Sequence, residues 1–164
     1  MLEQLMKLVE QNADKQIVQN KAIPDQFNNA AIKEVTNQIF DNLKGQVVGG
    51  NIQQVVAMFQ DKRGKSVGGN PVVTSMISSV TSSLTSKFGI STQVAESVAA
   101  SLVPQVLNQV IKKANDPQDI DFDLQQMMRG MSGNNNLDIT SMIGEQPKGG
   151  LGGLGNVFGK LFGK

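Results

Sequence analysis

The sequence predicts an all-α protein. It indicates a compact multi-helical domain over residues 1–143 and a Gly-rich C-terminal tail over residues 144–164. Apolar side chains recur at three- and four-residue spacing over most of the chain, which is the period of an amphipathic helix. The alternation typical of strands is missing, and aromatic residues make up only 4%. With 164 residues, 39% of them apolar, the chain is long enough to bury a core.

Three helices are expected in the first part of the chain. An apolar stripe predicts the first helix over residues 2–20. Ile-Pro-Asp at 23–25 begins the second, because Pro suits the first helical turn and Asp suits the positive end of the helix dipole. We expect this helix to end at Gly45 or just before Gly49-Gly50, and residues 52–59 to form a short third helix.

The same order of helices follows a Gly- and Lys-rich connection over residues 61–71. Asn70 is a good helix cap and Pro71 suits the first helical position, so a fourth helix is predicted to begin there. Gly89 ends it, and a fifth helix follows with its apolar stripe over residues 94–110.

Pro104 lies inside that fifth helix and removes one backbone donor. We expect a bent but continuous helix with Leu102, Val106 and Val110 buried. Asp123 then caps a short segment over residues 124–128, before a Gly- and Asn-rich stretch that begins at Gly130. A short turn over 137–143 leads to the tail.

An internal repeat is predicted from two constant offsets, with one unit over residues 2–60 and the other over 70–130. At an offset of 67, matching residue types fall on one another: Ile23 on Ile90, Gln26 on Gln93, Val35 on Leu102, Gln38 on Gln105 and Ile39 on Val106. At an offset of 72, residues 52–56 fall on residues 124–128. A tandem duplication explains both offsets, and the alternative is two unrelated helical hairpins of similar period.

The composition excludes much of catalytic chemistry. There is no Cys and no His, hence no thiol nucleophile, no Ser-His or Cys-His pair, and no zinc site of the usual ligands. Gly64-Lys65-Ser66 lacks the upstream Gly and strand of a phosphate-binding loop, and Gly150–Gly155 lacks the strand and acidic residue of a dinucleotide site. We therefore expect no enzyme activity, no catalytic residues and no cofactor.

One acidic cluster offers oxygen ligands to a cation such as calcium. It consists of Asp116, Asp119, Asp121 and Asp123. Its spacing does not match a calcium-binding loop, because Leu124 and Gly130 stand where that loop needs Gly and Glu. We favour helix capping by Asp123, with the other carboxylates near the same helix terminus, over a weak metal site.

Charge and hydropathy indicate where the protein acts. Fifteen Lys and Arg residues stand against 14 Asp and Glu residues, so the net charge of +1 gives no reason to expect nucleic-acid binding. Residues 1–9 do not have the basic start and unbroken apolar run of an export signal. No run of about 18 apolar residues is long enough to span a membrane. We expect a cytoplasmic protein.

The tail carries the only suspected interaction site. Its apolar residues have helical spacing and lysines lie among them: Leu151, Leu154, Val157, Phe158, Leu161 and Phe162, with Lys160 and Lys164. Such a segment can dock on a second copy of the chain or another protein, or lie on an anionic membrane surface. Its many glycines disfavour a free helix, so a flexible tail is the third alternative.

A resemblance to a known family adds to this interpretation. Residues 84–95 read Leu-Thr-Ser-Lys-Phe-Gly-Ile-Ser-Thr-Gln-Val-Ala, and residues 99–107 read Ala-Ala-Ser-Leu-Val-Pro-Gln-Val-Leu. These runs resemble the bacterial YidB-like family, a helical domain of unknown function. Thr92 follows Ser91 where the family usually has Pro, a minor departure. The resemblance implies an all-helical fold and brings no catalytic residues.

Two functions are therefore open. The first is a non-enzymatic helical interaction or scaffold protein that associates with itself or with a protein partner. The second is a membrane-surface or envelope-associated protein that is attached through the tail.

Overall fold

The computed structural model describes residues 2–61, 67–119 and 122–140. Every regular element within these ranges is helical, which confirms the predicted all-α class. The elements are α1 (Leu2–Ala13), the π-helical turn η1 (Asp14–Val18), the 3-10 turn η2 (Asp25–Phe27), α2 (Asn28–Val48), α3 (Ile52–Gln60), α4 (Pro71–Phe88), α5 (Thr92–Ala114) and α6 (Leu124–Ser132).

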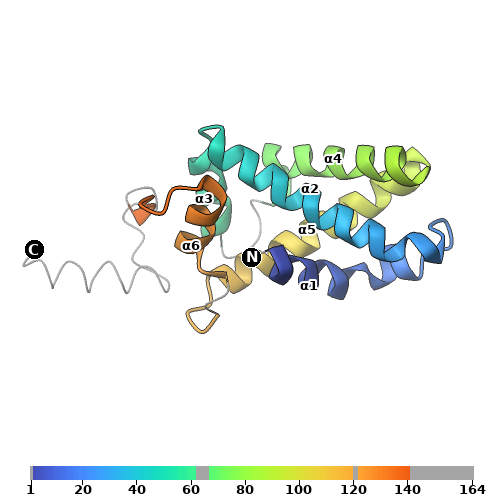
Figure 1. Cartoon of the computed structure of the whole chain (residues 1–164), viewed down its shortest axis with the longest axis horizontal. Coiled ribbons are helices and arrows are strands. Elements are labelled where there is room, and N and C mark those ends of the chain that lie inside the picture. The colour runs from blue at the N-terminus through green and yellow to red at the C-terminus, as the bar shows by residue number, and fades with distance from the viewer. Residues whose placement is uncertain (1, 62–66, 120–121, 141–164) are drawn as a thin grey trace, which may run out of the picture.

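Four long helices form the body of the molecule, and two short ones lie at one end. Figure 1 shows α1, α2, α4 and α5 along the long axis, with α3 and α6 together at one end. The helix α2 packs against α1, α4 and α6, while α5 packs against α4, α1 and α3. Their apolar faces meet in one core whose largest fully buried side chains include Leu5, Ile39, Leu43, Met76, Leu84, Leu102 and Leu107.

Several predicted helix boundaries are correct, and they share a local signal. The side chains of Asn70, Ser91 and Asp123 accept hydrogen bonds from backbone N–H groups in the first turns of α4, α5 and α6. Gly89 ends α4 as predicted, with a φ angle of 65°, a left-handed conformation that glycine adopts without a steric penalty. Gly133, where no boundary was predicted, ends α6 in the same way with a φ angle of 71°.

Other predicted helices differ from the observed ones in helix type or in where they end. The first stripe does not form one α-helix, because the backbone widens into the π turn η1, where the Gln19 N–H bonds to the carbonyl of Asp14. The second helix starts at Asn28, after a 3-10 turn, without a side-chain cap. The last helix passes through Gly130 to Ser132, since Met131 is fully buried and extends the apolar face of α6.

The helix α5 is continuous across Pro104. Leu102, Val106 and Val110 are all fully buried, as predicted. The apolar stripe therefore determines the course of this helix, and the missing backbone donor does not end it.

Candidate interaction site

A polar cluster joins α2 to the C-terminal end of α4. The Glu34 side chain is only 9% exposed, and its Oε2 lies 2.8 Å from Nζ of Lys87. Gln38 donates a hydrogen bond of 2.9 Å to the other carboxylate oxygen. Burial alone would raise the pKa of Glu34, but hydrogen bonds from Lys87, Gln38 and Ser83 and the Lys87 charge hold it below the ordinary value. The pair thus holds α4 against α2.

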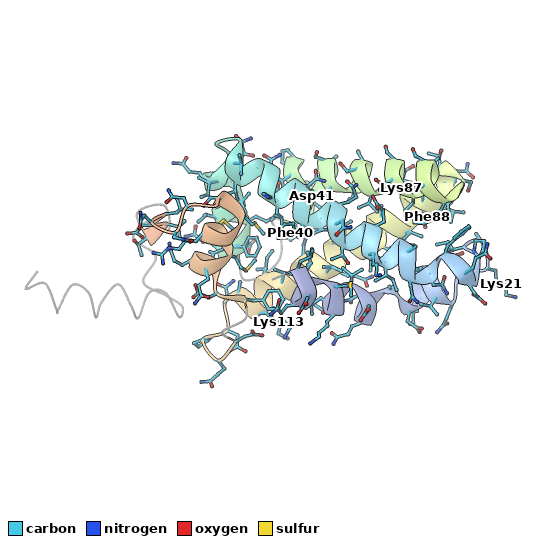
Figure 2. All side chains as sticks on the ribbon, in the orientation of Figure 1. Lys21, Phe40, Asp41, Lys87, Phe88 and Lys113 are labelled. Atoms are coloured by element: carbon cyan, nitrogen blue, oxygen red, sulfur yellow. The ribbon has the colours of Figure 1, made fainter. Side chains whose placement is uncertain are left out.

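An aromatic contact lies next to this cluster. The rings of Phe27 and Phe88 are tilted, with their centroids 5.6 Å apart. Figure 2 labels Lys87 and Phe88 at the end of α4, on the side of α2. Together the ion pair and the ring contact fix the start of α2 to the end of α4.

The Ser-rich face of α4 is divided between packing and solvent. Ser79 and Ser83 are half-buried and bond to α2, the former through its hydroxyl to Oδ1 of Asn42 at 3.4 Å. The remaining serines of this face are at least partly open to water: Ser75, Ser78, Ser82 and Ser86. On the opposite side of the bundle, Nε2 of Gln109 in α5 donates to Oδ1 of Asn12 in α1 at 3.1 Å.

The described members of the acidic cluster serve local structure. Asp123 Oδ1 accepts from the Gln126 N–H at 2.9 Å, which confirms the predicted cap of α6. Asp116 accepts from the Gln118 N–H at 2.9 Å, and Asp119 pairs with Lys113 at 3.1 Å. Asp121 lies outside the described residues. Within the described part of the chain, no three acidic residues gather where they could hold a metal ion.

Lys113 also connects this loop to the core. Its Nζ lies 5.8 Å from the ring centroid of Phe122, which is buried just before α6. Figure 2 labels Lys113 on α5, near the end of the molecule that carries α6. Nearby, the Asn115 side chain donates to the Phe59 carbonyl at 2.8 Å and so ties α5 to α3.

The segment that leads to the tail is held on α6 by a side-chain amide. Gln125 donates to the Leu137 carbonyl and accepts from the Ile139 N–H at 3.0 Å. The Arg129 Nε also donates to the Leu137 carbonyl at 2.8 Å, and Ile139 is fully buried. We call residues 137–140 the stem of the tail. Sequence reasoning missed this clamp, because its partners are 8 to 14 positions apart.

The stem ends in a tight polar turn. Hydrogen bonds from the Thr140 hydroxyl and backbone N–H hold the pKa of Asp138 below its ordinary value. The predicted interaction residues follow this turn in the chain, and all of them lie outside the described residues: Leu151, Leu154, Val157, Phe158, Lys160, Leu161, Phe162 and Lys164. The structure shows only the stem, residues 137–140, which precedes the segment that carries them.

Comparison with known proteins places the second half of the chain in a family. The family described as "Bacterial protein of unknown function (DUF937)" matches residues 70–164, more than half of the chain. The chain belongs to this bacterial family. The match begins at the cap of α4 and includes both the stem and the whole tail.

The predicted YidB-like resemblance is confirmed, because the residues that carry it lie inside the region that DUF937 matches. No curated protein and no solved structure matches the chain. A separate finding concerns membranes: among the described helices, none has the length and apolar character to cross a bilayer.

Proposed function

We propose that this DUF937 protein is a non-enzymatic helical interaction or scaffold protein of the cytoplasm, and that it self-associates through its C-terminal tail. The observation that carries the proposal is the stem. Three hydrogen bonds with the side chains of Gln125 and Arg129, together with the buried side chain of Ile139, fix it to α6. A tail that starts from a fixed point on a packed bundle is suited to reach a partner surface.

The use of polar side chains supports an interaction role over an enzymatic one. Glu34, Asn42 and Gln109 are partly or fully buried, and each bonds to a side chain on a neighbouring helix. Their capacity for hydrogen bonding is used to hold helices together. Polar groups used in this way stabilise a fold rather than act on a substrate.

The tail has the chemistry of a segment that orders on binding. Its two Phe, three Leu and one Val would each contribute on the order of 1.5–3 kcal/mol if fully buried. Ordering about twenty residues costs about 1–2 kcal/mol each for the backbone alone. Since the ordering cost of about 20–40 kcal/mol exceeds the gain of about 9–18 kcal/mol, we expect the tail to order only against a partner surface that adds hydrogen bonds and packing.

The test compares the full chain with a chain that lacks residues 144–164. The molar mass of each is measured by light scattering during gel filtration over a range of concentrations. We expect the full chain to associate as concentration rises and the shortened chain to remain monomeric with an unchanged helical signal. A full chain that stays monomeric throughout would contradict self-association.

Two variants of the full chain identify the chemistry of the contact. Leu154→Ser with Phe158→Ser breaks the apolar stripe and should abolish self-association. The matched control, Lys160→Gln with Lys164→Gln, keeps the stripe and removes two charges, so self-association should persist. Co-sedimentation with phosphatidylglycerol vesicles covers the membrane alternative: binding that fails in the lysine variant, with no self-association of the full chain, would favour it.

A further inference from the structure

The two halves of the molecule bury many of the same positions. We call residues 2–61 the N-terminal half and residues 67–140 the C-terminal half. The offset of 67 extends back through the first helices, where buried residues of α1 and η1 fall on buried residues of α4: Leu5 on Val72, Val9 on Met76, Ala13 on Val80 and Ile17 on Leu84. At the offset of 72, buried Val67 falls on buried Ile139, the residue that anchors the stem.

Two hydrogen bonds between the halves join corresponding positions. One runs from Gln109 in α5 to Asn12 in α1, and the other from Ser79 in α4 to Asn42 in α2. Adding 67 to position 12 gives 79, and adding 67 to position 42 gives 109. Positions 12 and 79 therefore correspond to each other, and so do positions 42 and 109. In both hydrogen bonds, the first position of one half contacts the second position of the other half.

Helix packing follows the same exchange. Exchanging α1 with α4, α2 with α5 and α3 with α6 converts the neighbours of α2 into the neighbours of α5. Reciprocal contact, in which position i meets j and j meets i, defines an isologous two-fold interface. One pair departs from it: α2 contacts α3 more extensively than α5 contacts α6, across a connection that is five residues longer in the C-terminal half (72 − 67 = 5).

We propose that the face of α4 and α5 that the N-terminal half covers is a self-association surface, which also fits a second C-terminal half. The predicted tandem duplication then made one chain out of a two-fold pair. This inference concerns the bundle and does not depend on the tail. It is favoured by the family match, which starts at residue 70 and so covers only one of the two halves.

The ion pair between Glu34 and Lys87 has no counterpart at the corresponding positions. It therefore predicts which of the two halves can pair with a second copy of itself. The corresponding positions hold Ser101 and Asn20. In a pair of C-terminal halves, Lys87 would face Ser101, and its side chain, 57% exposed here, could stay hydrated. In a pair of N-terminal halves, the buried Glu34 carboxylate would face Asn20 without a cation, which is unfavourable.

The experiment starts from the folded full chain with Leu154→Ser and Phe158→Ser, the variant in which association through the tail should be abolished. A specific protease site is inserted between Asp61 and Val67, the chain is cut, and the complexes are weighed by native mass spectrometry over a range of concentrations. We expect a complex of one N-terminal with one C-terminal fragment, which we call the unlike pair. We also expect a dimer of the C-terminal fragment, but no dimer of the N-terminal fragment. Observing the unlike pair with no C-terminal dimer at any concentration would overturn the proposal.

Two further variants test the proposal if the cut protein dissociates or unfolds. Glu34→Ser removes the buried carboxylate, so the cut variant should also form a dimer of the N-terminal fragment. In the second chain, residues 70–139 replace residues 1–67, so that Ile139 stands in the place of Val67. With the same two tail substitutions, we expect this chain to be a helical monomer that unfolds in one transition. If it does not fold cooperatively and no C-terminal dimer forms from the cut protein, the two halves are not interchangeable.

Discussion

The two halves bury many of the same positions, but their sequences specify the helix starts differently. In the C-terminal half, Asn70, Ser91 and Asp123 cap the three helices with their side chains. In the N-terminal half, Phe27 and Asn51 precede α2 and α3, and neither caps its helix with a side-chain hydrogen bond. The difference shows that one architecture can be specified by local hydrogen bonds in one half and by packing against its neighbour in the other.

The shared core gives the largest predicted effect. Leu43→Ala in α2 and Leu102→Ala in α5 each remove a fully buried side chain, so each should lower the free energy of unfolding by roughly 2–5 kcal/mol. Chemical denaturation should show one transition for both variants, because the halves share one core. Leu2→Ala, at a residue 42% exposed, is the control and should change stability by less than about 0.5 kcal/mol. A similarly small effect of Leu102→Ala would contradict the conclusion that both halves contribute to one core.

The contact between the halves gives the next effect. Glu34→Gln should lower the free energy of unfolding by about 1–2 kcal/mol at neutral pH, because a charged hydrogen-bond partner is lost. Asp41→Asn, at an exposed position of α2 that Figure 2 labels, is the matched control.

The same pair predicts a pH dependence. The folded-state pKa of Glu34 is lowered, so its contribution is fully present above the ordinary glutamate pKa of about 4.3 and is lost as pH falls through the lower value. Denaturation of wild type and Glu34→Gln from pH 7 to pH 3 measures this. The two stabilities should converge at acidic pH, and a constant difference would refute the assigned role.

The caps should give an effect of intermediate size that distinguishes the halves. Asn70→Ala removes the bond to the Val72 N–H and should cost about 1 kcal/mol. Asn51→Ala, at the start of α3, removes only an exposed bond to Gln46 and should change stability by less than about 0.5 kcal/mol. Thermal unfolding of both variants checks this, and equal costs would remove the contrast between the halves.

Glycines inside helices should give the smallest effects, with no difference between the halves. Gly45→Ala in α2 and Gly130→Ala in α6 place a methyl group in open space and should each stabilise the protein by about 0.5–1 kcal/mol. Gly133→Ala is the contrasting variant and should destabilise, because its φ of 71° disfavours a side chain. Melting temperatures should therefore move in opposite directions.

Local signals made much of the C-terminal half predictable. Asn70, Gly89 and Asp123 act on residues a few positions away, and the structure confirms the boundary at each of them. The start of α2 was missed because Phe27 and its neighbours carry no cap and only packing defines that end. The clamp by Gln125 and the pair of Glu34 with Lys87, 53 positions apart, depend on the fold and leave no local pattern.

The packing of α1 against both α2 and α5 has a consequence for synthesis of the chain. The residues of α1 are translated before those of α5, which begins only at Thr92. At about 5–20 residues per second, the ribosome needs several seconds to supply α5. During that interval α1 can pack against α2 but not against α5. The part of its apolar face that contacts α5 in the finished protein therefore stays exposed to solvent. A nascent chain stalled before residue 92 should therefore bind chaperones that the finished bundle does not.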